Sequence, residues 1–190
     1  MINSAIEQVH GINIHIVWQV ITPQQKQQLV EFWLKNGAIQ SQQEAIRRTN
    51  EAVCLAFDAD GGIAAVTTVY ISKLSKLPHD YYFYRMFIRP DCRLPGLGRR
   101  LLGHTYSQLN RQFNAQQMAL ASESSDSKMI GLSSNIPKGL VFITENLKLK
   151  QPAVNRALIK RGFKLIGLMD INTAEEKQVW NQDFTVQTTH

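Results

Sequence analysis

The sequence holds little cysteine. Only Cys54 and Cys92 occur in its 190 residues, and neither lies in a CxxC pair or in a Cys/His spacing typical of zinc. The N-terminus carries Glu7 where a secretion signal has a basic stretch followed by an apolar one. We therefore expect reduced thiols, no metal and a cytoplasmic location.

Long apolar runs are also missing. No run approaches the roughly 18 residues that a membrane helix needs, so no membrane partner is expected. Hydrophobic residues make up 44% of the chain, with 11 glycines and 6 prolines spread along it, which excludes collagen-like, low-complexity and disordered classes. At roughly 150 residues per domain, the length predicts a single domain over residues 1–190.

Positive charge is unevenly distributed. Residues 1–80 hold 6 basic and 7 acidic residues, whereas residues 81–190 hold 15 and 8. One stretch, residues 85–111, has six arginines and a single acidic residue, Asp91. Such a stretch is suited to a phosphate-bearing ligand, with a solvated basic face as the alternative. Its arginines are Arg85, Arg89, Arg93, Arg99, Arg100 and Arg111.

The hydrophobic pattern predicts an α/β protein with a mixed sheet and helices on both faces. Apolar and β-branched runs between turn residues predict strands at 12–20, 52–57, 63–71, 81–88, 140–144, 163–169 and 178–184. Caps at Thr22 and Ser41 and helical spacing elsewhere predict helices at 23–36, 41–50, from about 98 onward, and 152–161. The serine-rich segment 119–138 fits either a helix extension with a loop or an ordered insertion.

The sharpest local signal is Arg-Leu-Pro-Gly-Leu-Gly-Arg-Arg at residues 93–100, between a strand and a helix. Glycines let the backbone approach a phosphate, and N–H groups at a helix start offer donors and a partial positive charge. The loop lacks the Gly-Lys-Ser/Thr ending of a Walker loop and the third glycine of a dinucleotide fingerprint. It indicates an anion site, with a plain strand-to-helix turn as the alternative.

Residues 84–102, YRMFIRPDCRLPGLGRRLL, resemble the acetyl-coenzyme A motif of the GNAT superfamily of N-acetyltransferases. In that motif an apolar strand and a proline precede Arg/Gln-x-x-Gly-x-Gly/Ala at the start of a helix. Residues 152–163, which end in Lys-Arg-Gly-Phe, are similar to a later helix and Gly-Phe turn of the same family. The resemblance implies a GNAT-like fold with a central, mostly antiparallel twisted sheet, and acetyl-CoA as co-substrate without a metal.

The resemblance also implies which residues contact the coenzyme. The loop would hold the pyrophosphate with N–H groups from Leu94 through Arg99, and the strand before it would pair with the pantetheine arm. Gln151 stands where the family commonly has Asn, and Asn155 follows one helical turn later. The implied coenzyme-binding residues are Met86, Phe87, Ile88, Arg93, Leu94, Pro95, Gly96, Leu97, Gly98, Arg99, Arg100, Gln151 and Asn155.

The catalytic positions depart from the family pattern. The family often has a Glu base where this chain has Tyr82 or Tyr84, and a Tyr acid where it has Leu158. The best remaining base is Glu145, with a solvated carboxylate as the alternative. Tyr82 and Tyr84 share a strand face and could act as acid or orient the acceptor, or form an aromatic core face.

The resemblance implies an N-acyltransferase that passes acetyl from acetyl-CoA to a primary amine of a small molecule or peptide, by direct attack on the thioester. A missing carboxylate does not exclude this, because water can carry the proton. The missing Glu and Tyr keep a non-catalytic coenzyme A or acyl-CoA binding domain as the alternative. A pI near 9.4 suggests nucleic-acid binding, but no such motif supports it. The oligomeric state stays open, with a homodimer among the alternatives.

Overall fold

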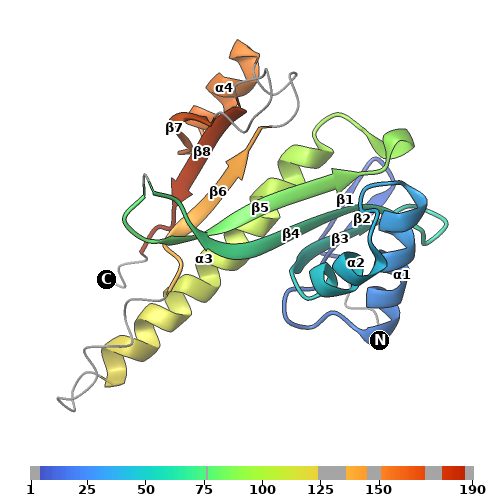
Figure 1. Ribbon diagram of the computed structural model, residues 1–190, viewed down its shortest axis with the longest axis horizontal. Helices are drawn as coiled ribbons and strands as arrows, with labels where there is room; N and C mark the ends of the chain where they lie inside the picture. Colours follow the sequence, from blue (N-terminus) through green and yellow to red (C-terminus); the bar gives the residue numbers. More distant parts are fainter. Residues whose placement is uncertain (1–4, 76, 124–135, 145–150, 170–176, 187–190) are drawn as a thin grey trace. The chain divides into compact units, whose positions relative to one another are not determined.

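Strands and helices occupy most of the sequence, and the computed structural model describes residues 5–75, 77–123, 136–144, 151–169 and 177–186 (Figure 1). The strands are β1 (Glu7–Val9), β2 (Ile12–Ile16), β3 (Ala52–Phe57), β4 (Ile63–Lys73), β5 (Asp80–Ile88), β6 (Gly139–Ile143), β7 (Lys164–Met169) and β8 (Lys177–Asp183). The helices are α1 (Pro23–Lys35), α2 (Gln42–Thr49), α3 (Leu97–Glu123) and α4 (Pro152–Ile159), with the 3-10 turn η1 (Pro90–Cys92). The predicted α/β class is confirmed.

The sheet is mixed, with the strand order β1-β2-β3-β4-β5-β6-β8-β7. Strands β1 to β4 pair antiparallel in sequence order, and β8 is antiparallel to both β6 and β7, whereas β5 and β6 are parallel. The chain divides into two compact units, the first Met1–Val69 with Arg85–Leu109 and the second Tyr70–Tyr84 with Asn110–His190. The single domain stays a prediction.

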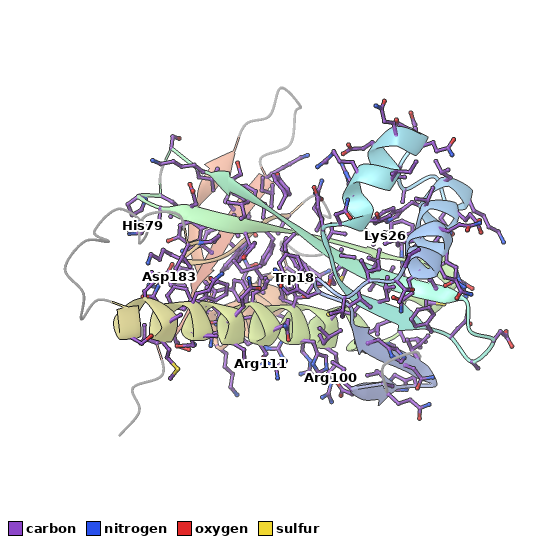
Figure 2. All side chains as sticks on the ribbon, turned by 90° about the horizontal axis from the view of Figure 1, so that it is seen from below. Trp18, Lys26, His79, Arg100, Arg111 and Asp183 are labelled. Carbon is purple, nitrogen blue, oxygen red and sulfur yellow. The ribbon has the colours of Figure 1, made fainter. Side chains whose placement is uncertain are left out.

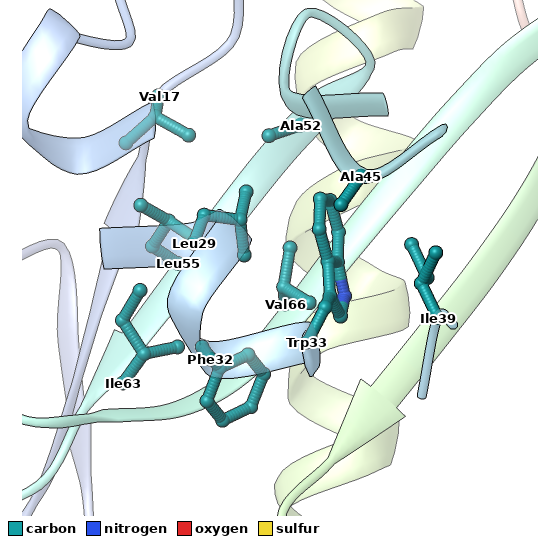
Figure 3. Packing of buried hydrophobic residues seen from close by; sticks show 10 residues of the cluster. All are labelled: Val17, Leu29, Phe32, Trp33, Ile39, Ala45, Ala52, Leu55, Ile63 and Val66. Atoms are coloured by element: carbon teal, nitrogen blue, oxygen red, sulfur yellow. The ribbon is translucent and has the colours of Figure 1, made fainter. Parts of the chain in front are cut away.

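In the first unit, α1 and α2 cover one face of β3 and β4. Thr22 and Gln25 form a reciprocal capping box at the start of α1, with Pro23 in the first turn. The helix then presents Leu29, Phe32 and Trp33 to the core. Figure 3 shows Trp33 among Ala45 of α2, Ile39 and Val66 of β4. The apolar face of α1 therefore attaches both helices to the sheet.

The opposite face of this unit's sheet meets the first half of α3 through small polar side chains. The hydroxyl oxygens of Thr67 and Thr105 are 2.9 Å apart, and Cys54 Sγ lies 3.5 Å from Thr105 Oγ1. All three side chains are buried. Burial raises the pKa of the Cys54 thiol, so Cys54 is a neutral packing group within this network.

Aromatic side chains form much of the interior of the second unit. Tyr81 and Phe83 of β5 form one buried cluster with Val141 and Val179. Elsewhere in the unit, the ring centroids of Phe113 and Phe184 lie 5.4 Å apart, and those of Phe142 and Phe163 lie 5.3 Å apart. The Phe that follows Gly162 in the second family-like motif is thus a core residue of this unit.

The N-terminal strand prediction was partly wrong. The strand predicted at 12–20 ends at Ile16, because Gln19 adopts φ +63° in a turn. The sequence reasoning also missed β1, which pairs with β2 through a two-residue turn of His10 and Gly11, with φ +48° and +81°. Two successive positive φ values are typical of a tight hairpin turn, and His-Gly is a weaker turn signal than Asn-Gly.

Two helix predictions need adjustment. The helix expected from about residue 98 runs from Leu97 to Glu123, so the start of the serine-rich segment extends the helix, and residues 124–135 lie outside the described residues. At α2, the Ser41 hydroxyl accepts from Glu44 N as predicted. The Glu44 carboxylate instead accepts hydrogen bonds from Arg47 and Arg48.

Candidate functional site

The glycine loop follows β5 and η1 and leads directly into α3. Leu97, the first residue of the helix, is fully buried and fixes the end of the loop. Gly96 has φ +82°, and apart from Gly96 and its two chain neighbours no heavy atom lies within 4 Å of the place where a Cβ would be. The position therefore requires glycine for its backbone conformation, and it leaves open space beside the chain.

The loop offers fewer N–H donors than the sequence suggested. Leu94 N donates to Cys92 O at 2.8 Å, Leu97 N donates to Leu94 O at 3.3 Å, and Pro95 has no N–H. The helical bonding begins with Arg100 N donating to Gly96 O at 3.0 Å. Because the first N–H groups of a helix lack intrahelical acceptors, Gly98 and Arg99 present their N–H groups at the positive end of the helix dipole.

The arginines of residues 85–111 are not equivalent. Arg93 and Arg99 are exposed on the loop and the first turn of α3. Arg100 projects from the first part of α3 (Figure 2), and its Nη1 lies 2.7 Å from Glu7 Oε1 in β1. The other oxygen of this carboxylate is 2.6 Å from His104 Nε2. The negative charge of Glu7 therefore compensates part of the positive charge predicted around the loop.

Two more of these arginines are held by carboxylates of the first unit. Arg85 in β5 binds Glu51, whose other oxygen lies 2.5 Å from Arg47 Nη1. Arg89 binds Asp58 at 2.8 Å and Asp91 at 2.7 Å. The number of arginines alone therefore overestimates the positive charge that is available to bind an anionic ligand. Sequence reasoning could not find the arginine pairs of Glu51, Asp58 and Glu7, because these carboxylates are distant from their arginines along the chain.

The end of β5 packs against the loop and α3. A Cβ at Gly98 would lie 3.1 Å from Met86 Cε and 3.6 Å from Ile88 Cδ1, so both side chains face the start of α3. Phe87 points to the other face, where its ring meets Phe32 of α1 at 5.5 Å. Met86 remains 40% exposed. Of the three predicted strand residues, Met86 and Ile88 thus contact α3, whereas Phe87 packs against the core under α1.

The predicted catalytic tyrosines lie in the second unit. Tyr82 is 6% exposed, its ring lies 6.3 Å from that of Phe184, and burial raises its pKa. Tyr84 is half-buried, with its ring 6.4 Å from that of Phe142. These contacts favour packing for Tyr82. The third candidate, Glu145, lies outside the described residues. The catalytic roles of all three stay predictions.

Helix α4 carries the remaining predicted coenzyme residues. Gln151 is the exposed N-cap of the helix, and its carbonyl oxygen accepts from Val154 N and Asn155 N. Asn155 Oδ1 is buried, and no described residue donates a hydrogen bond to it. A buried amide oxygen normally has a donor, so Asn155 has capacity for one more hydrogen bond. Leu158, at the position of the usual Tyr acid, is buried.

Two features are absent from the described residues. No group of three or more His, Cys, Asp or Glu side chains in this part of the chain could hold a metal ion. No helix among the same residues is both long and apolar enough to cross a membrane.

Comparison with known proteins identifies the fold. No family model matches the sequence, and no curated protein matches it. Solved structures do match, and the fold is that of the GNAT acetyltransferases. The fold expected from the resemblance is therefore confirmed.

Three solved structures illustrate the match. The ribosomal-protein-S18-alanine N-acetyltransferase from Escherichia coli has a TM-score of 0.57 at 12% identity, over 93% of this chain and 96% of that one. The ribosomal-protein-S5-alanine acetyltransferase from Vibrio fischeri has a TM-score of 0.55 at 12% identity, over 94% and 96%. A GNAT acetyltransferase from Streptococcus pneumoniae has a TM-score of 0.53 at 16% identity, over 92% and 99%. At such identities the likeness concerns the fold.

Proposed function

We propose that the chain is an acyl-CoA-dependent N-acyltransferase that transfers acetyl from acetyl-CoA to the primary amine of a small molecule or peptide. The observation that carries the proposal is the loop of residues 93–98. In a chain with the fold of the GNAT acetyltransferases, it joins β5 to the N-terminus of α3 with Gly96 in a left-handed conformation. N-acetyltransferases occur among the similar structures.

The residues of the loop fit a diphosphate. The N–H groups of Gly98 and Arg99 lie at the start of a long helix, where they favour an anion. Arg93 and Arg99 are exposed and can pair with phosphate oxygens. The open space beside Gly96 lets a phosphate approach the backbone.

The proposed reaction needs a free amine and a route for its proton. The amine nitrogen attacks the thioester carbonyl, the nitrogen loses a proton, and the acetyl carbon separates from the coenzyme sulfur, which leaves as the thiol. We assign removal of the nitrogen proton to Glu145, directly or through water, and delivery of a proton to the leaving sulfur to Tyr84. Tyr82, with its buried phenol, contributes packing in this scheme.

A second candidate is a non-catalytic coenzyme A or acyl-CoA binding domain. One observation favours it: Leu158, in place of the usual Tyr acid, is buried, as is Tyr82 at a position where the family often has its Glu base. A chain that keeps the phosphate loop and lacks catalytic groups would bind the coenzyme without turnover.

One experiment separates the two candidates. Acetyl-CoA is supplied with a panel of primary amines that includes peptides with free N-termini, and thiol release is recorded. Calorimetry with coenzyme A is run on the same preparation. Binding with amine-dependent thiol release is the expected result. Binding without release from any amine favours the binding domain, and absence of binding contradicts both candidates.

A further inference from the structure

Arg89 is the last residue before η1, and its backbone already joins two segments of the first unit. Its N–H donates to Ala64 O of β4 at 2.9 Å, and its carbonyl oxygen accepts from Cys92 N of η1 at 2.9 Å. The next link leads into the glycine loop, because Cys92 O accepts from Leu94 N at 2.8 Å. A shift of η1 would therefore move the start of the loop.

The Arg89 side chain connects the same segments a second time. Its Nε donates to Asp91 Oδ1 of η1 at 2.7 Å, and its Nη1 donates to Ile63 O of β4 at 3.2 Å. Its Nη2 donates to Asp58 Oδ2 at 2.8 Å and to Cys92 Sγ at 3.1 Å. The side chain is 26% exposed. These donors are directed at protein acceptors, so they are poorly placed for phosphate.

Asp58, the main partner of Arg89, is itself fixed within the β3–β4 turn. Its Oδ1 accepts from Gly62 N at 2.8 Å and from Asp60 N at 3.1 Å. Burial raises the pKa of this carboxyl, but the hydrogen bonds from Arg89 and Gly62 outweigh burial and leave the pKa lowered. Asp58 is therefore ionised at neutral pH, and Arg89 is anchored to a hydrogen-bonded turn.

We propose that Arg89 is a positioning residue that ties η1 to the β3–β4 hairpin and thereby holds residues 93–98 in the conformation that receives the coenzyme diphosphate. The inference rests on the proposed function. It assigns Arg89 a different task from Arg93 and Arg99, which meet the phosphates, and it makes the β3–β4 turn part of the support of the site. Loop preorganisation raises affinity because less ordering remains to be done on binding.

The first test measures the loop without ligand. Trypsin cleaves after arginine, except before proline, so the bond after Arg93 is a target while the Arg89–Pro90 bond is not. Arg89→Gln should raise the rate of cleavage after Arg93 by about tenfold, because the loop opens more often. The control Glu44→Gln breaks exposed arginine pairs on α2 and should leave that rate unchanged. Equal rates in Arg89→Gln and wild type would overturn the proposal.

The second test separates positioning from phosphate contact. Calorimetry with coenzyme A at several salt concentrations should show Arg89→Gln binding about tenfold more weakly with the salt slope of the wild type. Arg99→Gln should instead bind more weakly with a shallower slope. If Arg89→Gln also flattens the slope, or binds as wild type does, the proposal is wrong.

Asp58→Asn provides an independent variant in case Arg89→Gln does not fold. It retains the size of the side chain and an oxygen for the turn but removes the charge that anchors Arg89. We expect a smaller loss of affinity, about threefold, again at an unchanged salt slope. Wild-type affinity in Asp58→Asn would contradict the anchoring role. If the wild-type chain binds no coenzyme A at all, the proposed function fails, whereas the trypsin test still decides the role of Arg89.

Discussion

In the first unit, charged side chains bind one another across different elements, whereas aromatic rings dominate the interior of the second. Three carboxylates there each join two segments through ion pairs with arginines: Glu7, Glu51 and Asp58. For example, Arg100 Nη1 lies 2.7 Å from Glu7 Oε1. In the second unit, the rings of Phe113 and Phe184 pack at 5.4 Å, while Lys164 Nζ and Asp183 Oδ2 are 4.0 Å apart.

The difference matches what each unit is proposed to do. Directional ion pairs can fix a loop whose N–H groups must meet an anion, because each donor specifies a geometry. Aromatic packing excludes water but fixes polar groups less tightly. Substitutions in the first unit should therefore change coenzyme affinity, and substitutions in the second should change the rate of transfer.

The largest expected effect concerns the cores of the two units. Trp33→Ala in α1 and Trp180→Ala in β8 each remove a buried indole and should cost about 3–5 kcal/mol of unfolding free energy. Urea denaturation of both variants, with exposed Ile159→Ala as control, measures this. One shared transition supports a single domain over residues 1–190. Two transitions, each sensitive to its own tryptophan, would contradict it.

The next effect concerns the loop. Gly96→Asp places a side chain and a negative charge beside the proposed diphosphate and strains a backbone at φ +82°, so coenzyme A affinity should fall by about 100-fold or more. Gly37→Asp is the matched control, since Gly37 has φ +64° and open space but lies at the end of α1. Calorimetry measures the coenzyme A affinity of both variants, and only the Gly96 variant should lose affinity. If Gly96→Asp binds coenzyme A with wild-type affinity, the loop does not contact the coenzyme diphosphate.

A third prediction tests the proposed base. Glu145→Gln should lower kcat at neutral pH by about tenfold or more with little change in coenzyme A affinity, because a general base acts only on the transfer step. The deficit should shrink at high pH, where the free amine needs no base. Steady-state rates from pH 6 to about 9 check this. If Glu145→Gln keeps full activity across that range, water or another group removes the proton from the amine.

Salt dependence gives a smaller effect. Coenzyme A affinity should decrease a few-fold as ionic strength rises through about 0.15 M, because exposed arginine–phosphate pairs are screened. Arg99→Gln should reduce this slope more than Arg100→Gln does, since Arg100 is already paired with Glu7. A flat wild-type response would show that backbone N–H groups and the pantetheine arm dominate binding.

The smallest effect is the acid sensitivity of α2. Hydrogen bonds from Arg47 and Arg48 lower the pKa of Glu44 from 4.5 to about 2. In the unfolded chain Glu44 takes up a proton near pH 4.5, so its contribution to stability is complete above that pH and is lost as the pH falls toward 2. Glu44→Gln should therefore flatten Tm against pH in this window, modestly because the pairs are exposed. If the curves of Tm against pH are parallel for the wild type and Glu44→Gln, the Glu44 pairs do not contribute to stability in this window.

Much of the fold could be predicted from local patterns. Thr22-Pro23 and Ser41 marked helix starts because capping chemistry depends on neighbouring residues. The acidic and glycine residues at 58–62 marked the β3–β4 turn for the same reason. The glycine loop and the Gly-Phe turn pointed to the GNAT fold. By contrast, β1 was missed, because a three-residue strand after an unusual turn has little periodicity to detect.

The sequence by itself determined most of the elements, the position of the glycine loop and the excess of positive charge around it, since each depends on residues close together in the chain. Only the tertiary structure decided which arginines are committed to carboxylates. Arg89 to Asp58, Arg85 to Glu51 and Arg100 to Glu7 are pairs separated by 31 or more residues. The physical reason is that charge is a property of each residue, whereas the partner of a charge depends on folding.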